Sequence, residues 1–495
     1  MIERLRELSG SERIYARSVT EWEGTTYFLA RNGDSRHDGV GTKVLGVIGE
    51  TTGFAGELRG EVMVCPLNAE NAAALRARLP WLHPVPLGLT TSAGCGDRLG
   101  LATPGHIQAL RAVSGTIAPI WAQQSMRENA RTGRSPQDVM DDALWGVFQE
   151  GWRDAWGADA DHLKTTDDID LCVAAGYTFY TIDPGAHVDN AAHTDAVETL
   201  QRKFAVLPWS RLDDYADAMR ARYVGSSFSA GGPTLTFDEE QVLRAACKYG
   251  GALAHTAEMY RHLAQVARAA GLAFELEVSV DETETPTSPL EHVFIARELQ
   301  RLGVEWVSLA PRYVGRFEKG VDYIGDLDVF DAEFATHAAI AQDLGPYKLS
   351  IHSGSDKFSV YPLMAAHTGG VAHLKTAGTS YLEALRAVAG VDPGFFRQIL
   401  TLAIERYDHD RATYHVSADV SKVPAPDSVR DEALAGVLDL FDGREVLHVT
   451  FGSVLDAYGD RLKAVLDAHE EAHYAALRAH FIRHLMPFAA PGGAV

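Results

Sequence analysis

Eight short β-rich runs, each followed by a segment with helical periodicity, recur between about residue 86 and residue 390. Each run ends in polar or glycine-rich residues. They cover residues 86–100, 116–128, 161–170, 177–189, 273–282, 304–313, 347–357 and 371–381. Strands that alternate with helices in this number predict a (β/α)8 barrel, a fold whose size range includes about 300 residues. The chain has no GxGxxG after an early strand, so an open dinucleotide-binding sheet is less favoured.

The flanking segments have different patterns. Residues 1–85 predict a small α/β segment, with strands at 41–49 and 61–67 and a helix at 68–80. The catalytic barrel is expected at 86–390. Residues 391–495 predict a mainly helical extension, which could pack around the barrel or build a homo-oligomer interface. Its amphipathic patterns cover residues 392–410, 428–443 and 466–488.

Composition excludes several classes of protein. The net charge of −22 argues against a nucleic-acid-binding surface, and any anionic substrate would need a local cluster of Lys and Arg. Four cysteines without CxxC spacing suggest neither a disulfide framework nor a zinc knuckle. No signal peptide and no run of about 18 apolar residues is visible, so we expect a cytoplasmic protein without a membrane partner.

The segment YKLSIHSGSDK, residues 347–357, is the clearest candidate for a strand that leads into an active site. Its polar Lys348, Ser350 and His352 alternate with Leu349 and Ile351, which gives the strand one polar face. A half-exposed antiparallel strand would show the same alternation. Barrel active sites lie at the C-terminal ends of the strands. The polar residues expected there are Asp97, Arg98, Gln124, Glu128, Lys164, Asp183, His187, Asp189, Asp281, Arg312, His352, Asp356, Lys357 and Lys375.

Histidine and carboxylate side chains in this set suggest a divalent metal. We expect His352, His187 and Asp281 as ligands, with His415 folding back over the mouth of the barrel. Mixed His and carboxylate ligands suit Mn²⁺, Zn²⁺, Ni²⁺, Co²⁺ or Fe²⁺. There is no HExxH motif, so the metal prediction depends on the fold. The alternative for each single histidine is that it is an ordinary polar loop residue.

Six blocks of the chain resemble the tagaturonate epimerase family: residues 96–106, 178–190, 277–300, 307–326, 345–362 and 373–386. The resemblance covers roughly residues 90–420. It implies a metal-dependent interconversion of D-tagaturonate and D-fructuronate, although some relatives act on the neutral ketohexoses fructose and tagatose. The resemblance also implies that Glu128 and Asp281 are the acid/base pair. Asp281 therefore has two expected roles, as metal ligand or as proton carrier.

The chemistry of these sugars narrows the mechanism. The inverted carbon lies two bonds from the ketone, so its hydrogen is not acidified by the carbonyl. A retro-aldol route, in which the adjacent C–C bond breaks and a metal holds the enediolate, needs no redox cofactor. The alternative of transient oxidation by NAD lacks a dinucleotide fingerprint.

The expected substrate-binding residues are Lys164, Asp183, Arg312, Ser353, Asp356, Lys357 and Lys375. The cations among them would hold the carboxylate of a sugar acid. A metal-dependent sugar isomerase or aldolase would need similar groups. A sugar-binding barrel without turnover is the non-enzymatic alternative.

Overall fold

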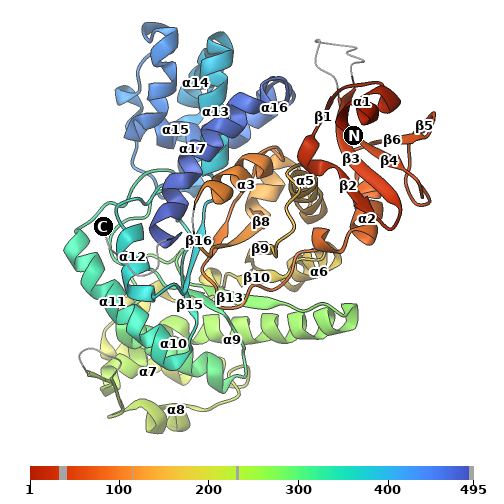
Figure 1. Cartoon of the computed structure of the whole chain (residues 1–495). Coiled ribbons are helices and arrows are strands. Elements are labelled where there is room, and N and C mark those ends of the chain that lie inside the picture. The colour runs from red at the N-terminus through yellow and green to blue at the C-terminus, as the bar shows by residue number, and fades with distance from the viewer. Residues whose placement is uncertain (33–41, 114, 230–233, 490–495) are drawn as a thin grey trace.

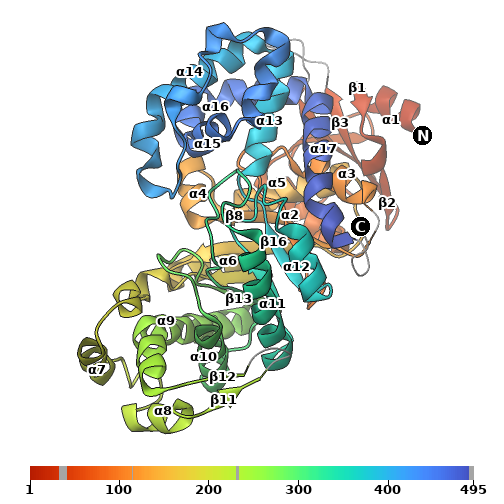
Figure 2. The same ribbon diagram turned by 90° about the vertical axis from the view of Figure 1, so that its left-hand side faces the viewer.

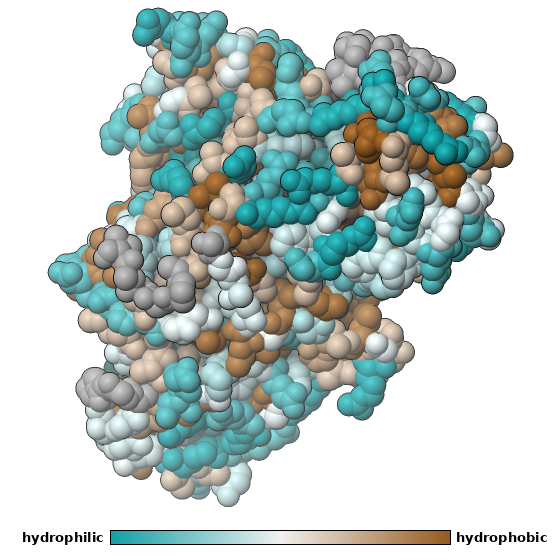
Figure 3. All heavy atoms as spheres, in the orientation of Figure 1, coloured by the Kyte–Doolittle hydropathy of each residue, from teal (hydrophilic) through white to brown (hydrophobic). Residues whose placement is uncertain are grey.

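The computed structural model describes residues 1–32, 42–113, 115–229 and 234–489. Figure 1 shows a central barrel, a small sheet beside the N-terminus and a group of helices formed by the C-terminal part of the chain. A rotated view places the C-terminal helices and the helices after β10 at opposite ends of the molecule (Figure 2). Hydrophilic side chains cover much of the face seen in Figure 3, where apolar side chains gather over the N-terminal sheet.

Eight parallel strands form a closed barrel, which confirms the predicted fold class. Each strand pairs with the next along the chain, and the last, β16, pairs with the first, β7. The strands are β7 (Ser92–Gly94), β8 (Ala118–Ser125), β9 (Gly157–Leu163), β10 (Phe179–Ile182), β13 (Glu275–Ser279), β14 (Ser308–Ala310), β15 (Lys348–Ile351) and β16 (Ala372–Lys375).

A helix follows each strand, as the sequence pattern predicts. These helices are α3 (Thr103–Ala112), α4 (Met126–Thr132) with α5 (Pro136–Gln149), α6 (Thr166–Ala174), α9 (Glu239–Ala270), α10 (Pro289–Arg301), α11 (Leu327–Leu344), α12 (Tyr361–Thr368) and α13 (Thr379–Val391). The segment between β10 and α9 also holds α7 (Val197–Ala205), α8 (Ala216–Tyr223) and the two-stranded pair β11 (Ser227–Phe228) and β12 (Leu235–Thr236).

The third strand was predicted in the wrong place. It was expected at residues 161–170, but β9 begins at Gly157 and helix α6 begins at Thr166. The Thr165 hydroxyl accepts a hydrogen bond from the Asp168 N–H, and the Asp168 carboxylate accepts one from the Thr165 N–H. This reciprocal cap fixes the start of α6, so the residues after it cannot belong to the strand.

The N-terminal sheet has six strands in antiparallel pairs, in the order β1-β3-β4-β6-β5 with β2 beside β3. Its elements are α1 (Ile2–Ser9), β1 (Ser11–Ile14), β2 (Thr20–Trp22), β3 (Thr25–Asn32), β4 (Lys43–Ile48), β5 (Glu57–Arg59), β6 (Val62–Pro66) and α2 (Ala69–Arg78). The predicted strands at 41–49 and 61–67 correspond to β4 and β6, and the predicted helix to α2. Gly41 lies outside the described residues.

The C-terminal extension is helical, as expected. It contains α14 (Pro393–Asp410), the 3₁₀ segment η8 (Asp431–Asp439), α15 (Phe441–Val449), α16 (Phe451–Ala468) and α17 (Glu470–Ala489). The single helix predicted at 428–443 is wrong, because that stretch is mostly 3₁₀ and α15 begins only at Phe441. The division of the chain at residues 85 and 390 stays a prediction.

Helix α17 connects all three parts of the molecule. It packs against α3, α12 and α13 on the outside of the barrel. At its first residue, Glu470 forms ion pairs with Lys43 (2.9 Å) and Arg13 (2.6 Å) of the N-terminal sheet. Further along, His480 and His484 contact the loop after β15. None of the helices in the described part of the chain combines the length and apolar character needed to cross a bilayer.

Candidate active site

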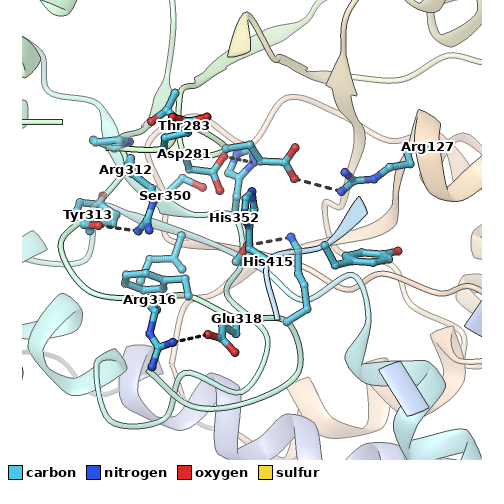
Figure 4. Close-up of a pocket in the computed structure, with 18 residues that line it drawn as sticks. Arg127, Asp281, Thr283, Arg312, Tyr313, Arg316, Glu318, Ser350, His352 and His415 are labelled. Atoms are coloured by element: carbon cyan, nitrogen blue, oxygen red, sulfur yellow. Dashed lines mark hydrogen bonds and ion pairs between the residues drawn. The ribbon is translucent and has the colours of Figure 1, made fainter. Parts of the chain in front are cut away.

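Two neighbouring cavities lie at the C-terminal ends of the barrel strands. The larger has a volume of about 300 Å³ and is lined by residues that follow β13, β14 and β15. A smaller one, of about 30 Å³, lies beside the ends of β8 and β9. Their shared wall consists of Arg127, Lys319, His352, Ser353 and Tyr414. Figure 4 shows the larger cavity with Arg312 and Arg127 on opposite sides and His352 between them.

A cluster of buried charges lies beneath these cavities. The Lys375 Nζ is fully buried and lies 2.9 Å from Asp159, 2.7 Å from Asp161 and 2.9 Å from Glu277. Burial disfavours the charged lysine, but these three carboxylates raise its pKa above the ordinary value. Burial also raises the pKa of Asp159, to about 7, despite the attraction of Lys375. Lys375 therefore supplies a positive charge that the three interior carboxylates share.

Two imidazoles face each other above this charged core. His352 hydrogen-bonds Glu277 through Nε2, and its Nδ1 lies 3.3 Å from the Nε2 of His162. His162 in turn hydrogen-bonds Asp183 through Nδ1, at 3.2 Å. A carboxylate on one imidazole nitrogen favours the N–H there and leaves the lone pair on the other nitrogen. The two facing nitrogens are therefore bridged either by a proton, with His162 charged and donating to His352, or by a metal cation that binds a lone pair of each imidazole.

Carboxylates complete the surroundings of the two imidazoles. The Oδ1 of Asp161 lies 3.9 Å from His162 and 4.0 Å from His352, and the Oδ1 of Asp281 lies 3.7 Å from the Nδ1 of His352. Burial opposes charge on His162, but Asp161 and the neighbouring carboxylates raise its pKa to about 10. The surroundings of the His162 imidazole therefore favour a positive charge. Asp161, His162 and His352 have ligand atoms close enough together to hold a metal ion.

An irregularity in β9 positions two of these groups. The register between β9 and β10 shifts between Tyr180 and Ile182, and His162 has a φ of 54°. A bulge inserts an extra residue on one strand and redirects its side chains. Here it lets the consecutive residues Asp161 and His162 both line the smaller cavity, whereas a regular strand would send them to opposite faces.

Glu128 lies at the start of α4, where Ser125 caps the helix. The Nε of Arg98 donates a hydrogen bond to Oε1 of Glu128 at 2.9 Å, and Nη2 donates to the same oxygen. The other carboxylate oxygen lies 3.5 Å from the Ser125 hydroxyl. Glu128 lines the smaller cavity with one oxygen fixed by Arg98 and the other less engaged.

The structure brings most of the predicted site residues to one end of the barrel. His352, Asp281, Arg312 and Ser353 line the larger cavity, as does the exposed His415, which is outside the ligand cluster. Asp183 contacts His162 and also Lys164, whose side chain is 54% exposed. Lys375 lies below the cavities, with its charge satisfied by the interior carboxylates.

Three of the expected metal-ligating and substrate-binding residues lie elsewhere. His187 is exposed and its ring stacks on His255 of α9, with ring centres 4.1 Å apart, outside the ligand cluster. Asp356 turns toward the C-terminal helices and pairs with Arg444 at 3.0 Å. The Lys357 Nζ is buried and donates to backbone carbonyls, so neither Asp356 nor Lys357 lines a cavity.

Sequence reasoning missed Asp161 and His162 as site residues because β9 was placed too late. The signal was present, since Thr165 and Asp168 have the spacing of a helix cap and so place the strand end near Leu163. Lys319 was also missed. It belongs to the loop after β14, six residues beyond the end of the predicted run at Tyr313, and its sequence context gives no signal.

A closed barrel with a polar, charged cavity at the C-terminal ends of its strands has the architecture of the (β/α)8-barrel enzymes. The sequence model of one family, tagaturonate epimerase, matches residues 15–487. The chain belongs to the tagaturonate epimerase family and is therefore an isomerase-class enzyme. The expected family resemblance is confirmed.

Individual relatives agree with this assignment. The chain is 43% identical over 481 residues to the tagaturonate/fructuronate epimerase of Thermotoga maritima, which covers 95% of this chain and 96% of the relative. It also resembles crystal structures of fructuronate-tagaturonate epimerase UxaE from Cohnella laeviribosi. The complex with one glycerol has a TM-score of 0.90 at 38% identity and covers 98% of both chains. The complex with two glycerols has a TM-score of 0.91 at 38% identity and covers 98% of this chain and 99% of the other.

Proposed function

We propose that the protein interconverts D-tagaturonate and D-fructuronate with the help of a divalent metal. The observation that carries this proposal is the convergence of the His162 Nε2, the His352 Nδ1 and the Asp161 carboxylate, at the mouth of a barrel from the tagaturonate epimerase family. The names of the relatives from Thermotoga maritima and Cohnella laeviribosi support the choice of substrates.

The residues that would hold the metal are Asp161, His162 and His352. Their donor set fits Mn²⁺, Zn²⁺, Ni²⁺, Co²⁺ or Fe²⁺. Glu277 and Asp183 orient the two imidazoles from behind, as carboxylates do for metal-bound histidines. A metal bound there would act as a Lewis acid toward negative charge that develops on substrate oxygens.

We assign the proton transfers to Glu128 and Asp281. Asp281 accepts a hydrogen bond from Ser279 at 2.5 Å and lines the larger cavity, while Glu128 faces the smaller cavity with its less engaged oxygen. In the retro-aldol route one of these carboxylates accepts the proton of the hydroxyl on the inverted carbon, and the adjacent C–C bond breaks. The resulting aldehyde presents its other face, the bond forms again, and the proton returns to the new alkoxide oxygen.

The metal proposal is tested by replacing His162 with glutamine and measuring bound metal by mass spectrometry. We expect the wild-type protein to retain metal after dialysis, and the His162→Gln variant to lose both metal and turnover of tagaturonate. His187→Gln is the matched control, because His187 lies outside the ligand cluster, and should keep both. Equal metal content in the two variants would contradict the assignment.

Asp281→Asn separates the two roles of that residue. As a proton carrier it can be neutralised without loss of metal, so we expect bound metal to remain and turnover to fall by roughly 10²–10⁴-fold. Loss of the metal would make Asp281 a ligand instead.

Reaction in D₂O tests the proposed route. Retro-aldol chemistry leaves the carbon-bound hydrogen of the inverted carbon in place, so fructuronate formed in D₂O should carry no deuterium there by NMR. Deuterium at that carbon would reject the route, and accumulation of cleavage products would indicate an aldolase. The cytoplasmic location and the homo-oligomer interface stay predictions.

A further inference from the structure

Four basic side chains line the larger cavity: Arg127, Arg312, Arg316 and Lys319. Two of them have carboxylate partners, since Arg127 lies 3.1 Å from Glu282 and Arg316 lies 3.2 Å from Glu318. These ion pairs are visible in Figure 4. Their charges are already balanced within the protein.

The other two differ in what they contact. The Nη1 of Arg312 donates hydrogen bonds to the backbone carbonyls of Tyr313 and Gly315, at 2.8 and 3.0 Å. Lys319 donates one hydrogen bond, to the Oγ of Ser353 at 2.8 Å. Among the described residues, no carboxylate lies within ion-pairing distance of the Lys319 ammonium group. In a chain with a net charge of −22, a cavity cation without a carboxylate partner is a candidate for binding an anionic group of a ligand.

The backbone on both sides of Lys319 is fixed by buried cations. The Lys357 Nζ donates to the carbonyl of Glu318 at 2.7 Å, and the Nε of Arg444 donates to the carbonyl of Gly320 at 2.6 Å. Both cations are at least nine-tenths buried. Lys319 therefore extends from an anchored loop into the shared wall of the two cavities, and little ordering is needed when a ligand binds.

Ser353 provides a second donor at the same place. Its oxygen accepts from Lys319, so its own hydroxyl hydrogen remains available to another acceptor. Ser353 also directly follows His352, which places this pair of donors beside the candidate metal centre. One ammonium and one hydroxyl hydrogen at adjacent positions match the two oxygens of a carboxylate.

We propose that Lys319, with Ser353, binds the carboxylate of the sugar acid and sets the preference for hexuronates over neutral ketohexoses. This inference rests on the proposed function, because it assigns a role at the same site. The hexuronate carboxylate lies two carbons from the inverted carbon. A carboxylate-binding group must therefore stand close to the reacting atoms, as Lys319 does.

Lys319→Met removes the charge and keeps a similar length. We expect its kcat/KM for tagaturonate to fall by about 100-fold, as loss of a hydrogen bond to a charged group implies. D-Tagatose has a CH₂OH group where the uronate has a carboxylate. Assayed as an inhibitor of tagaturonate conversion, it should keep its inhibition constant within about threefold, because it has no carboxylate to lose.

Two further variants complete the test. Lys319→Arg keeps the charge and should restore at least a tenth of the wild-type kcat/KM. Arg316→Met removes a cation of the same cavity that is already paired with Glu318, and should leave the kcat/KM for tagaturonate within about threefold of wild type. Thermal melting verifies that all variants are folded.

Three results would overturn the inference: an unchanged kcat/KM for tagaturonate in Lys319→Met, an equal weakening of tagatose binding in that variant, or an equal loss in Arg316→Met. A wild-type protein that converts neither tagaturonate nor fructuronate is a different outcome. That result would overturn the proposed function itself, and the inference with it.

Discussion

Replacing Asp356 with asparagine tests whether the C-terminal helices hold the loop after β15. Asp356 is only 3% exposed. Its carboxylate lies 3.0 Å from Arg444, accepts a hydrogen bond from Thr379 at 3.1 Å and contacts His480. Burial favours the neutral acid, but Arg444 and His480 hold the pKa of Asp356 well below its ordinary value. Asp356 is therefore a buried anion, and its contacts with Arg444 and His480 stabilise the charged form.

The magnitude follows from what the substitution leaves behind. Asparagine has nearly the same volume, so little packing is lost, but the buried guanidinium of Arg444 loses its strongest partner. Breaking a buried ion pair costs about 3–5 kcal/mol. Arg444 keeps a second carboxylate, Glu383, at 3.3 Å, so we take the lower end of the range. A cost of about 3 kcal/mol corresponds to roughly a 100-fold change in the equilibrium for opening the loop.

Amide hydrogen exchange of peptides covering residues 352–357 measures this opening directly. A chain with several parts need not unfold in one step, so local exchange is more informative than a global midpoint. We expect about 100-fold faster exchange in Asp356→Asn. The control is Asp408→Asn on the exposed surface of α14, which should exchange like the wild-type protein.

Unchanged exchange in Asp356→Asn would refute this reasoning. A double-mutant cycle with Arg444→Met adds a second criterion. The two side chains are in contact, so the combined cost should differ from the sum of the single costs by about 0.5–3 kcal/mol. Additive costs would show that the ion pair does not couple the loop to the helices.

Three further substitutions test other parts of the molecule. Lys375→Met leaves the interior carboxylates without a counter-charge and should lower stability by at least about 3–5 kcal/mol, measured by thermal melting, whereas Lys164→Met at the exposed rim should change it by less than about 0.5 kcal/mol. Burial and a neighbouring glutamate raise the pKa of Glu445 from 4.5 to about 8, so the folded state retains a proton that the unfolded chain releases above pH 4.5. Stability should therefore fall as pH rises from 4.5 to 8, and Glu445→Gln should flatten that fall in melting curves at pH 5 to 8. In Gly378→Ala the new Cβ would lie 1.9 Å from the Cε1 of His448, so this side chain, which lines the smaller cavity, would have to move. Turnover of tagaturonate and melting temperature should therefore both decrease.

The barrel was predictable because its signal is repeated. Each predicted run ends in polar or glycine-rich residues, and a helix follows each strand, so an error in one run does not alter the count. The 3₁₀ segment η8 was not predictable in the same way. Its apolar residues have helical spacing, so the sequence pattern does not distinguish a 3₁₀ segment from an α-helix; in the structure it packs against α13 and α15.

The candidate site was predicted only where strand ends were placed correctly. His352 and Asp281 were expected to lie together, and the Nδ1 of His352 is 3.7 Å from the Oδ1 of Asp281. His162 was missed because β9 was placed too late, although the helix cap at Thr165 indicates where the strand ends. The His162 side chain also reaches the cavity through a bulge, which the local sequence does not reveal. His187 and Asp356 were selected because they follow strands. Which way such a residue turns depends on neighbours far along the chain, in α9 and α17.

Helix α17 has a consequence for the order of events during protein synthesis. It is made after all eight barrel strands, yet its histidines contact the loop that carries His352 and its first residue pairs with the N-terminal sheet. A ribosome-bound barrel therefore lacks this support until α17 has emerged. A nascent chain that stops before α17 would present an unsupported active-site loop, so we expect turnover only after α17 has been made.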